Sequence, residues 1–324
     1  NDANNDNTAI GYNAGAAVTT GTNNTLVGAH AGDALTTGDA NVAIGWDALG
    51  GEDAHGFNVA VGYEALQLLD AGANGENVAV GYLAGTEMTT GQFNVAVGSH
   101  AMDSQTGQNQ TVAVGYHAGS SNVSGAENVF VGAQAGYATT GGYNTFTGYH
   151  AGTANTSGQY NTFMGRKAGF ACTTGLYSVA IGAGAAGSMG DGNATEGTTV
   201  IGYNAGTGIT TGDNNTCIGH LAGDGIQGGA SNIMIGHGSE GSAAGAANQI
   251  TIGIGVACSE DNQITIGKAS NTLKNEFDTD NAWTQSSDVR KKKNIEDAVL
   301  GLDFVNDLRP VTYEWKPNNE FPKD

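Results

Sequence analysis

A short apolar stretch that ends in glycine recurs along most of the chain. A typical copy, residues 77–93, reads NVAVGYLAGTEMTTGQF. Three positions before the glycine (position −3) lies Val, Thr or Ile in all sixteen copies, and position −1 is Ile or Val in fourteen. β-branched residues two apart are typical of a strand. The pattern predicts a short strand before each of the glycines at 11, 28, 45, 62, 81, 98, 115, 132, 148, 165, 182, 202, 219, 236, 253 and 267.

The spacing of these glycines defines the fold class. It is 17 residues in most intervals, with exceptions of 19, 16, 20 and 14. Seventeen residues are too few for a strand and a helix of ordinary length, but they suit one rung of a parallel β-solenoid or β-roll. Neighbouring strands lie about 4.8 Å apart, so the rungs together would span roughly 75 Å. We predict an all-β solenoid of about sixteen 17-residue rungs.

Polar positions of the repeat predict how each rung turns. Asparagine occupies position −4 in eleven copies, where it can bond the nearby backbone or form a ladder with the copies above and below. The triplet TTG, found in six copies, reads as the return turn, with its glycine available for a positive φ angle.

Alanine at two positions predicts self-association. Position −2 is Ala in seven copies and otherwise mostly apolar, so both sides of the strand look buried, and +3 is Ala in thirteen copies. One side can fill the interior, and the other needs a partner, for which small alanines allow close approach around a symmetry axis. We expect a homotrimer, with a monomeric solenoid as the alternative. The pattern NVAVGxxAG resembles the head repeats of trimeric autotransporter adhesins over about residues 7–270, and this resemblance also implies a trimeric parallel β-roll.

Composition narrows the function. The net charge is −20, which argues against binding to nucleic acid, and no apolar run is long enough to span a membrane. The three cysteines form no CxxC pair, and we expect no cofactor and no metal. Asn1 is not a natural start, so we expect a processing boundary there. Eight of the eleven Lys and Arg residues lie after residue 273, which indicates a domain boundary.

Several features of the repeats suggest chemistry without choosing a site. Histidine or tyrosine follows the glycine at +1 or +2 in many rungs, which suggests either a column that stacks on sugars, rings of histidines that bind an ion, or a tolerant surface position. The pair Glu52 and Asp53 suggests a glycosidase, and Asp-Asn turns and Thr-rich faces suggest Ca²⁺ or ice binding less strongly. The longer intervals, 62–81 and 182–202, predict exposed loops. The histidines that follow the recurring glycine at +1 or +2 are His30, His100, His117, His150, His220 and His237.

The last part of the chain has a different pattern. Residues 268–285 read as a less regular connector. Apolar residues at helical spacing from Ile295 to Leu308 predict an amphipathic helix that ends before Pro310, and VTYEW at 311–315 predicts a strand. Four consecutive basic residues, 290–293, lie next to Ser286 and Ser287.

This stretch resembles the intramolecular chaperone domain of endosialidase-type phage tailspikes and tail fibres. The matching motif is Ser-Asp-x-Arg-x-Lys-x-Asn-Ile, from Ser287 to Ile295, followed by LRPVTYEWK at 308–316. The resemblance implies that the domain aligns three chains and then releases itself by cutting between Ser286 and Ser287. It implies Ser287 as nucleophile and Lys292 as base, because a serine needs a neighbouring base to accept its proton. The same motif supplies Asp288, Arg290 and Asn294 as supporting residues.

Together these patterns predict a phage tail fibre or tailspike. We expect a solenoid shaft or receptor-binding region at 1–270, a connector at 271–286 and the start of a truncated α+β chaperone domain at 287–324. The expected partners are two further copies of the chain and a host cell-surface receptor, with no nucleic acid and no membrane insertion. The expected location is the virion, and self-cleavage is the only enzymatic step expected. A cellular trimeric adhesin and a polysaccharide depolymerase are the alternatives.

Overall fold

The computed structural model describes residues 5–189, 196–278 and 284–285. Contacts between Cα atoms divide the chain into two units, Asn1–Ser286 and Ser287–Asp324. The second unit lies outside the described residues, and so do the amphipathic helix and the strand predicted at 311–315.

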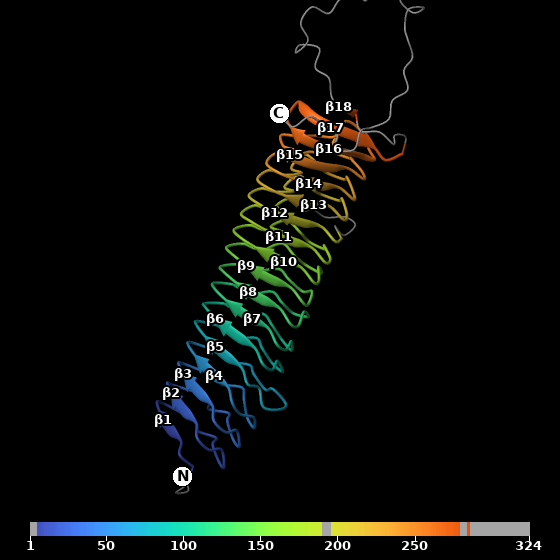
Figure 1. Cartoon of the computed structure of the whole chain (residues 1–324). Helices are drawn as coiled ribbons and strands as arrows, with labels where there is room; N and C mark the ends of the chain where they lie inside the picture. The colour runs from blue at the N-terminus through green and yellow to red at the C-terminus, as the bar shows by residue number, and fades with distance from the viewer. Residues whose placement is uncertain (1–4, 190–195, 279–283, 286–324) are drawn as a thin grey trace, which may run out of the picture. The chain divides into compact units, whose positions relative to one another are not determined.

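Sixteen short strands stack in sequence order to form a parallel β-solenoid (Figure 1). Fifteen parallel pairings join them, which makes about 15 turns of the solenoid, and the described residues contain no helix. The predicted fold class is confirmed. The strands are β1 Thr8–Ile10, β2 Thr25–Val27, β3 Val42–Ile44, β4 Val59–Val61, β5 Val78–Val80, β6 Val95–Val97, β7 Val112–Val114, β8 Val129–Val131, β9 Thr145–Thr147, β10 Thr162–Met164, β11 Val179–Ile181, β12 Thr199–Ile201, β13 Thr216–Ile218, β14 Ile233–Ile235, β15 Ile250–Ile254 and β16 Gln263–Lys268.

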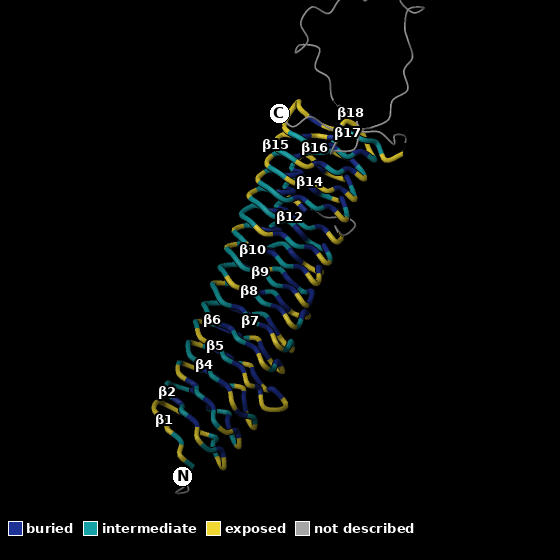
Figure 2. The backbone as a smooth tube through the Cα atoms, in the orientation of Figure 1, coloured by how far each residue is buried: buried dark blue, intermediate teal, exposed yellow. Residues whose placement is uncertain are grey.

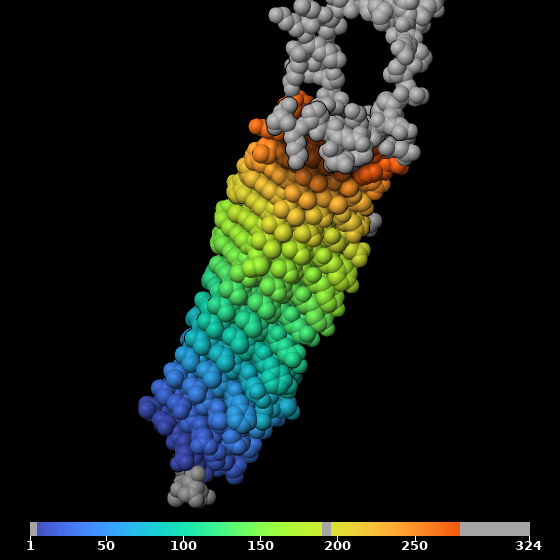
Figure 3. Space-filling view, in the orientation of Figure 1, coloured from blue at the N-terminus to red at the C-terminus, as the bar shows by residue number. Residues whose placement is uncertain are grey.

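Pairing between rungs keeps every repeat position in one column. Val42 of β3 pairs with Val59 of β4, and Ala43 pairs with Ala60. The same holds across the 19-residue interval, where Val59 pairs with Val78, so the two additional residues are absorbed outside the strands. In the space-filling view the rungs form successive bands in order of sequence (Figure 3).

The C-terminal end of the stack has antiparallel pairing, unlike the parallel pairing of the rungs. After β16 the chain reverses, and β17 (Asn271–Glu276) pairs antiparallel with β16. β18 (Thr284–Gln285) then pairs antiparallel with β17. These strands lie within the residues that we expected to form an irregular connector. The antiparallel hairpin occupies the edge of the last parallel strand, which would otherwise present unpaired N–H and C=O groups.

Alanine lies inside the single chain, which corrects the sequence prediction that alanines approach a symmetry axis. The side chain at −2 is fully buried in strand after strand, as Ala43 and Ala60 show. Alanine at +3, such as Ala48 and Ala65, is equally buried. The reason is the alternation of a strand, which places −2 on one side and −3 and −1 on the other. Buried positions therefore recur in register from rung to rung, with exposed residues at the corners (Figure 2).

The interior is filled by complementary volumes at −2 and +4. Three successive rungs carry a buried Phe at −2, and each carries Gly at +4. A Cβ at Gly152 would lie 2.4 Å from Cδ2 of Phe146, so no side chain fits there. Where −2 is Ala, the +4 position can hold a large residue, as with Ala43 and Leu49. Because the interior is closely packed, the size of the side chain at −2 determines the size of the side chain that fits at +4 of the same rung.

Each recurring glycine is required by conformation and by space. These sixteen glycines have φ angles between 127° and 152°, a region that other L-residues rarely adopt. A Cβ at Gly45 would also lie 2.1 Å from the carbonyl oxygen of Gly62 in the next rung. The prediction that the glycine of the TTG triplet uses a positive φ angle is wrong for Gly21 and Gly38, whose φ angles are not positive. It is required by space alone, since a Cβ at Gly38 would lie 2.2 Å from the His55 carbonyl oxygen.

The asparagines at −4 form the predicted ladder through the backbone. The Oδ1 atom of Asn24 accepts a hydrogen bond from the backbone N–H of Asn41 at 2.8 Å, and Oδ1 of Asn41 accepts from Asn58 N–H at 2.9 Å. The amide nitrogen of Asn24 donates to the Gly38 carbonyl at 2.8 Å. These side chains are buried, and each one ties its own rung to the next. The ladder is interrupted where the column changes to Thr111, which has no amide to continue it, and it resumes at Asn128, whose Oδ1 accepts from Asn144 N–H at 2.8 Å.

Candidate functional site

The most extensive surface feature is the side of the strands opposite the core. We call the side chains at −3 and −1 of β1–β16 the outward face. Sixteen strands with two such positions each give 32 side chains, and all are Val, Ile, Thr or Met. They are half-buried or exposed in the single chain, and Val80, at 36% exposure, is typical of the more exposed ones. The outward face is therefore largely apolar, with Thr at seven of its 32 positions, uncharged and uncovered by any described part of the chain.

A second feature is a column of ring-bearing side chains at the corner after the recurring glycine. We call the aromatic and histidine side chains at +1, +2 and +5 the ring column. It is continuous from Tyr12 to Tyr137, with ring centroids between 4.3 and 6.4 Å apart. Trp46 and Tyr63 are stacked at 4.9 Å, and Tyr63 and Tyr82 at 5.4 Å. Stacked rings cover each other's faces, so the part of the column from Trp46 to Tyr82 presents ring edges to solvent. This favours a structural role for these rings over the stacking of sugars.

Histidines at +2 in adjacent rungs share one carboxylate. The rings of His100 and His117 stack at 4.6 Å with an interplanar angle of 18°. The Nδ1 atom of His100 lies 2.9 Å from Asp103 Oδ2, and that of His117 lies 3.9 Å from the same oxygen. These three residues are near enough to hold a metal ion. Nearly parallel rings direct their in-plane lone pairs side by side, however, so the two nitrogens do not converge on one point.

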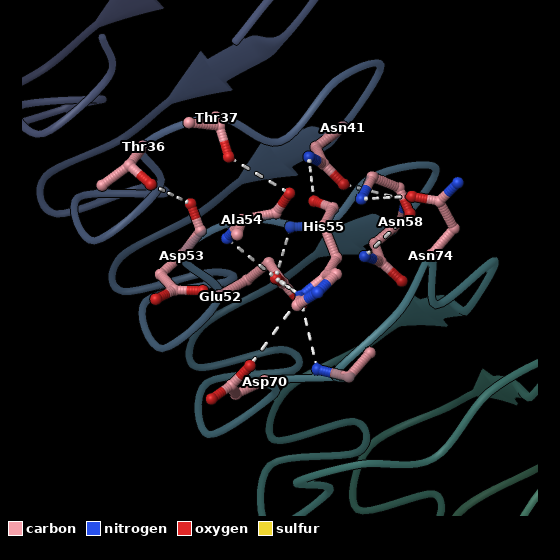
Figure 4. A network of polar contacts seen from close by, with 12 residues as sticks. Thr36, Thr37, Asn41, Glu52, Asp53, Ala54, His55, Asn58, Asp70 and Asn74 are labelled. Atoms are coloured by element: carbon pink, nitrogen blue, oxygen red, sulfur yellow. Dashed lines mark hydrogen bonds and ion pairs between the residues drawn. The ribbon is translucent and has the colours of Figure 1, made fainter. Parts of the chain in front are cut away.

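The candidate carboxylate pair has unequal surroundings. Glu52 occupies position +7, which is Leu35 in the preceding rung and Leu69 in the following one, and it is fully buried. Its Oε1 accepts hydrogen bonds from the His55 backbone N–H at 2.8 Å and from the Ala54 N–H at 3.3 Å (Figure 4).

Two more contacts complete the surroundings of Glu52. Nδ1 of His55 lies 3.0 Å from Glu52 Oε1, and Ala71 N–H donates to Oε2 at 3.3 Å (Figure 4). Asp53 is exposed, and its backbone carbonyl accepts from Thr36 N–H. The buried carboxylate thus holds a corner that lacks the TTG turn and anchors the start of the longer loop. This arrangement does not present two acids to a substrate in the way that glycosidase chemistry requires.

Two titratable groups near the C-terminal end of the stack have strongly shifted pKa values. Burial, together with hydrogen bonding to Asp224, raises the pKa of Glu240 to about 8. Its carboxylate also accepts hydrogen bonds from Asp224 N–H at 2.9 Å and Gly225 N–H at 3.1 Å. Burial raises the pKa of the Cys217 thiol to about 12, so this buried cysteine is an inert core residue.

The residues predicted to cut the chain lie outside the described residues. These are Ser287, Lys292, Asp288, Arg290 and Asn294, with the bond between Ser286 and Ser287. Their roles stay predictions, and so does the boundary of the chaperone segment. Sequence reasoning missed His55 and Asp103. A signal was present for Asp103, because the +2 and +5 positions carry His and Asp in two rungs, at His30–Asp33 and at His100–Asp103.

The described fold defines the class of this molecule as a parallel β-solenoid repeat protein whose outward face is uncovered. Comparison with known families adds the C-terminal part. Residues 287–324 match the family model described as chaperone of endosialidase. No curated protein and no solved structure matches the chain. Among the described residues, no helix is long and apolar enough to cross a membrane.

Proposed function

We propose that the protein is a homotrimeric attachment fibre whose subunits pack through the outward face. The observation that carries the proposal is that this face has no charged residue at any of its 32 positions, in a chain of net charge −20. Acidic surfaces on different copies of the chain repel one another, so copies associate most easily through a surface without charge. Burial of the Val and Ile side chains that fourteen of the sixteen strands present on this face supplies the stabilisation.

The chaperone match gives a reason for a folding helper. Every parallel pairing in the stack joins equivalent positions, so slippage by one whole rung would keep most side chains on the correct side of the strand. Several chains multiply such errors during folding. A segment that brings the chains together at one end would set the register of the first rung, from which the others extend.

Self-release of the chaperone is the second part of the proposal. Ser287 attacks the carbonyl of Ser286, so that the peptide C–N bond breaks, the Ser286 acyl group is held as an ester on the Ser287 oxygen, and the Ser287 nitrogen takes up a proton to become a free amine. Water then hydrolyses the ester, which leaves a carboxylate on Ser286 and releases the chaperone with Ser287 at its start. Lys292 accepts the serine proton, and the neighbouring cations, Arg290 among them, lower the pKa that this lysine would otherwise have. Asp288 and Asn294 orient the reacting groups. Once the chaperone has left, an unfolded trimer cannot be rebuilt, so the assembly is stabilised kinetically.

Mass spectrometry of the full-length protein tests this step. The parent is expected to yield a fragment that starts at residue 287, and Ser287→Ala is expected to remain uncut. Ser286→Ala is the matched control, because it keeps the attacking hydroxyl and should be cut as the parent is. Cutting of Ser287→Ala at the same bond would refute the assignment of the nucleophile.

Sedimentation equilibrium tests the trimer and its interface. Its mass in solution should be three times the subunit mass. Val80→Lys together with Val114→Lys should reduce the trimer to monomers, because each of the two substituted rungs would bury three unpaired charges in the interface. Val123→Lys is the matched control. Val123 is a 48% exposed valine that lies in a turn and not on the outward face. A monomeric parent, or a trimer unaffected by the double substitution, would refute the proposed interface.

Attachment to a host and location on a virion form the outermost part of the proposal. A repeat stack with an intramolecular chaperone suits a fibre that must be long, resistant and correctly aligned. Antibodies against the solenoid should label the tail fibres of virions in electron micrographs and should block adsorption to host cells. Labelling of a cell envelope instead would contradict the location.

A further inference from the structure

The rung of Gly165 carries a pair of cations that stands out in the acidic solenoid. Arg166 and Lys167 occupy its +1 and +2 positions, and the only other basic residues of Lys or Arg type in the described part of the chain are Lys268 and Lys274. Neither Arg166 nor Lys167 forms an ion pair with a described carboxylate. Nζ of Lys167 lies 5.0 Å from the centre of the Phe170 ring. Two cations without a carboxylate partner leave a local positive potential for an anion.

The preceding rung adds an aromatic and a histidine to this place. Tyr149 and His150 lie at +1 and +2 of that rung, with their rings in edge contact at 4.0 Å, and Tyr149 is half exposed. Burial, followed by the charges of Lys167 and Arg166, lowers the pKa of His150. His150 therefore lies near enough to both cations to feel their charge.

The following rung lacks large side chains at the same corner. Its +1 and +2 positions are Ala183 and Gly184, so the ring column is interrupted for one rung. The next rung resumes with Tyr203, which is exposed and whose ring contacts His220 on the side away from the interruption. Among the described rings, none covers the side of Tyr203 that faces Ala183. This differs from Trp46, Tyr63 and Tyr82, whose faces are occupied by neighbouring rings.

We infer that this corner, from Tyr149 to Tyr203, binds a glycan that carries carboxylate groups. The guanidinium of Arg166 can hold a carboxylate through two parallel hydrogen bonds, and Lys167 adds a second charge. The uncovered face of Tyr203 can pack against the apolar C–H face of a sugar ring. Three intervals between rungs amount to about 14 Å, which is enough for a short stretch of sugars along the stack.

The inference deepens the proposed attachment role and rests on it for its biological meaning, but the binding itself can be measured separately. The probe is oligogalacturonate, measured by isothermal titration calorimetry against the full-length protein at low ionic strength. Carboxyl-reduced oligogalacturonate is the matched ligand without charge, and polyphosphate is the matched anion without a sugar. Binding is expected for oligogalacturonate, with at least tenfold weaker binding of the other two.

Two sets of variants test the site. Arg166→Gln with Lys167→Gln removes both charges and should weaken binding at least tenfold, whereas Lys268→Gln, at the same +1 position of another rung, should change it less than twofold. Ala183→Tyr should also weaken binding at least tenfold, because it places a ring in the interruption, and six rungs already hold tyrosine at +1. Ala133→Tyr is its control, since Ala133 is the +1 alanine of a rung outside the proposed site.

The outcomes separate the inference from the proposed function. Failure of the parent to bind oligogalacturonate, equal binding of polyphosphate, or equal losses in the variants and their controls would each overturn the glycan site. Sedimentation of the same samples reports the trimer independently. A trimer that does not bind oligogalacturonate refutes this inference and leaves the fibre intact, whereas binding by a monomer refutes the fibre and leaves the site.

Discussion

Two buried asparagines, Asn161 and Asn155, allow the ladder to be weighed against a matched neighbour. Asn161, at position −4, donates to the Gly175 carbonyl at 2.6 Å and to Asn144 Oδ1 at 3.2 Å, and accepts from Ser178 N–H at 3.0 Å. Asn155, at +7, is equally buried, but neither its Oδ1 nor its Nδ2 has a hydrogen-bond partner. Replacing either residue with Ala removes the same atoms. The two variants therefore differ chiefly in the hydrogen bonds that are lost.

The magnitudes follow from these contacts. Asn161→Ala loses three hydrogen bonds of about 1 kcal/mol each and leaves the Ser178 N–H and the Gly175 carbonyl without that partner, so the loss should be about 3–5 kcal/mol. Asn155→Ala leaves a similar cavity, but it also removes a polar group that was buried at a cost of about 1–3 kcal/mol. Its net effect should be about 1 kcal/mol or less. The ladder variant should thus be less stable by about 3 kcal/mol.

Guanidinium denaturation at fixed protein concentration measures the difference, because an oligomer's stability depends on concentration. Hydrogen exchange adds a local readout. The Ser178 amide should exchange faster in Asn161→Ala and be unchanged in Asn155→Ala. Equal losses of stability in the two variants, or the larger loss in Asn155→Ala, would refute the view that the ladder joins the rungs through its hydrogen bonds.

Two further predictions concern charge and volume. The folded pKa of Glu240, about 8, lies above its unfolded value of 4.5, so the folded state holds a proton that the unfolded state releases, and stability should fall as the pH rises from 5 to 8.5. Because the group is only half-buried, the loss should be on the order of 1 kcal/mol, and Glu240→Gln should abolish it in denaturant titrations at the two pH values. Gly152 and Gly238 both have φ of 58°, but a Cβ would meet Phe146 at 2.4 Å in the first and nothing within 4 Å in the second. Gly152→Ala should therefore lower the melting temperature further, by the equivalent of about 1–3 kcal/mol of overpacking, and equal shifts would contradict the volume argument.

Periodicity was enough to predict the solenoid, because one signal was repeated sixteen times. Each strand is only three residues long in most rungs, too short to be recognised alone, but the glycine and its β-branched neighbours recur in register. The asparagine ladder was also predictable, since an amide that returns at a fixed position in a stack has the next rung as its nearest partner.

Orientation of the strands could not be predicted from the same pattern. Ala43 and its equivalents on one side, and Val42 and Ile44 on the other, are all apolar, so alternation did not show which side faces the interior. Small residues were taken as a sign of close approach between subunits. The interior accepts them because a large side chain at +4, such as Leu49, fills the remaining volume, and that compensation involves residues on opposite sides of the rung.

The candidate sites were harder to predict for a related reason. Tyr63 and Tyr82 occupy the position that a sugar-binding column would use, and only the interplanar angle shows that they cover each other. Whether Arg166 can bind a carboxylate depends on its neighbours, among them Gly184, which has no side chain to fill the corner. A site built from four consecutive rungs has no motif along the chain, because its members are separated by one repeat or more.

The paired side-chain volumes at −2 and +4 are matched within each rung, so rungs of the same composition are interchangeable. A rung with Phe163 and Gly169 can be followed or preceded by another of the same kind, but a rung that combined Phe with a large residue at +4 could not close. Whole rungs can therefore be duplicated or deleted inside a block of like composition, because each new neighbour makes the same contacts as the old one. Length can change in steps of one rung, whereas the C-terminal end of the stack is set by the hairpin of β17, where the parallel pairing ends.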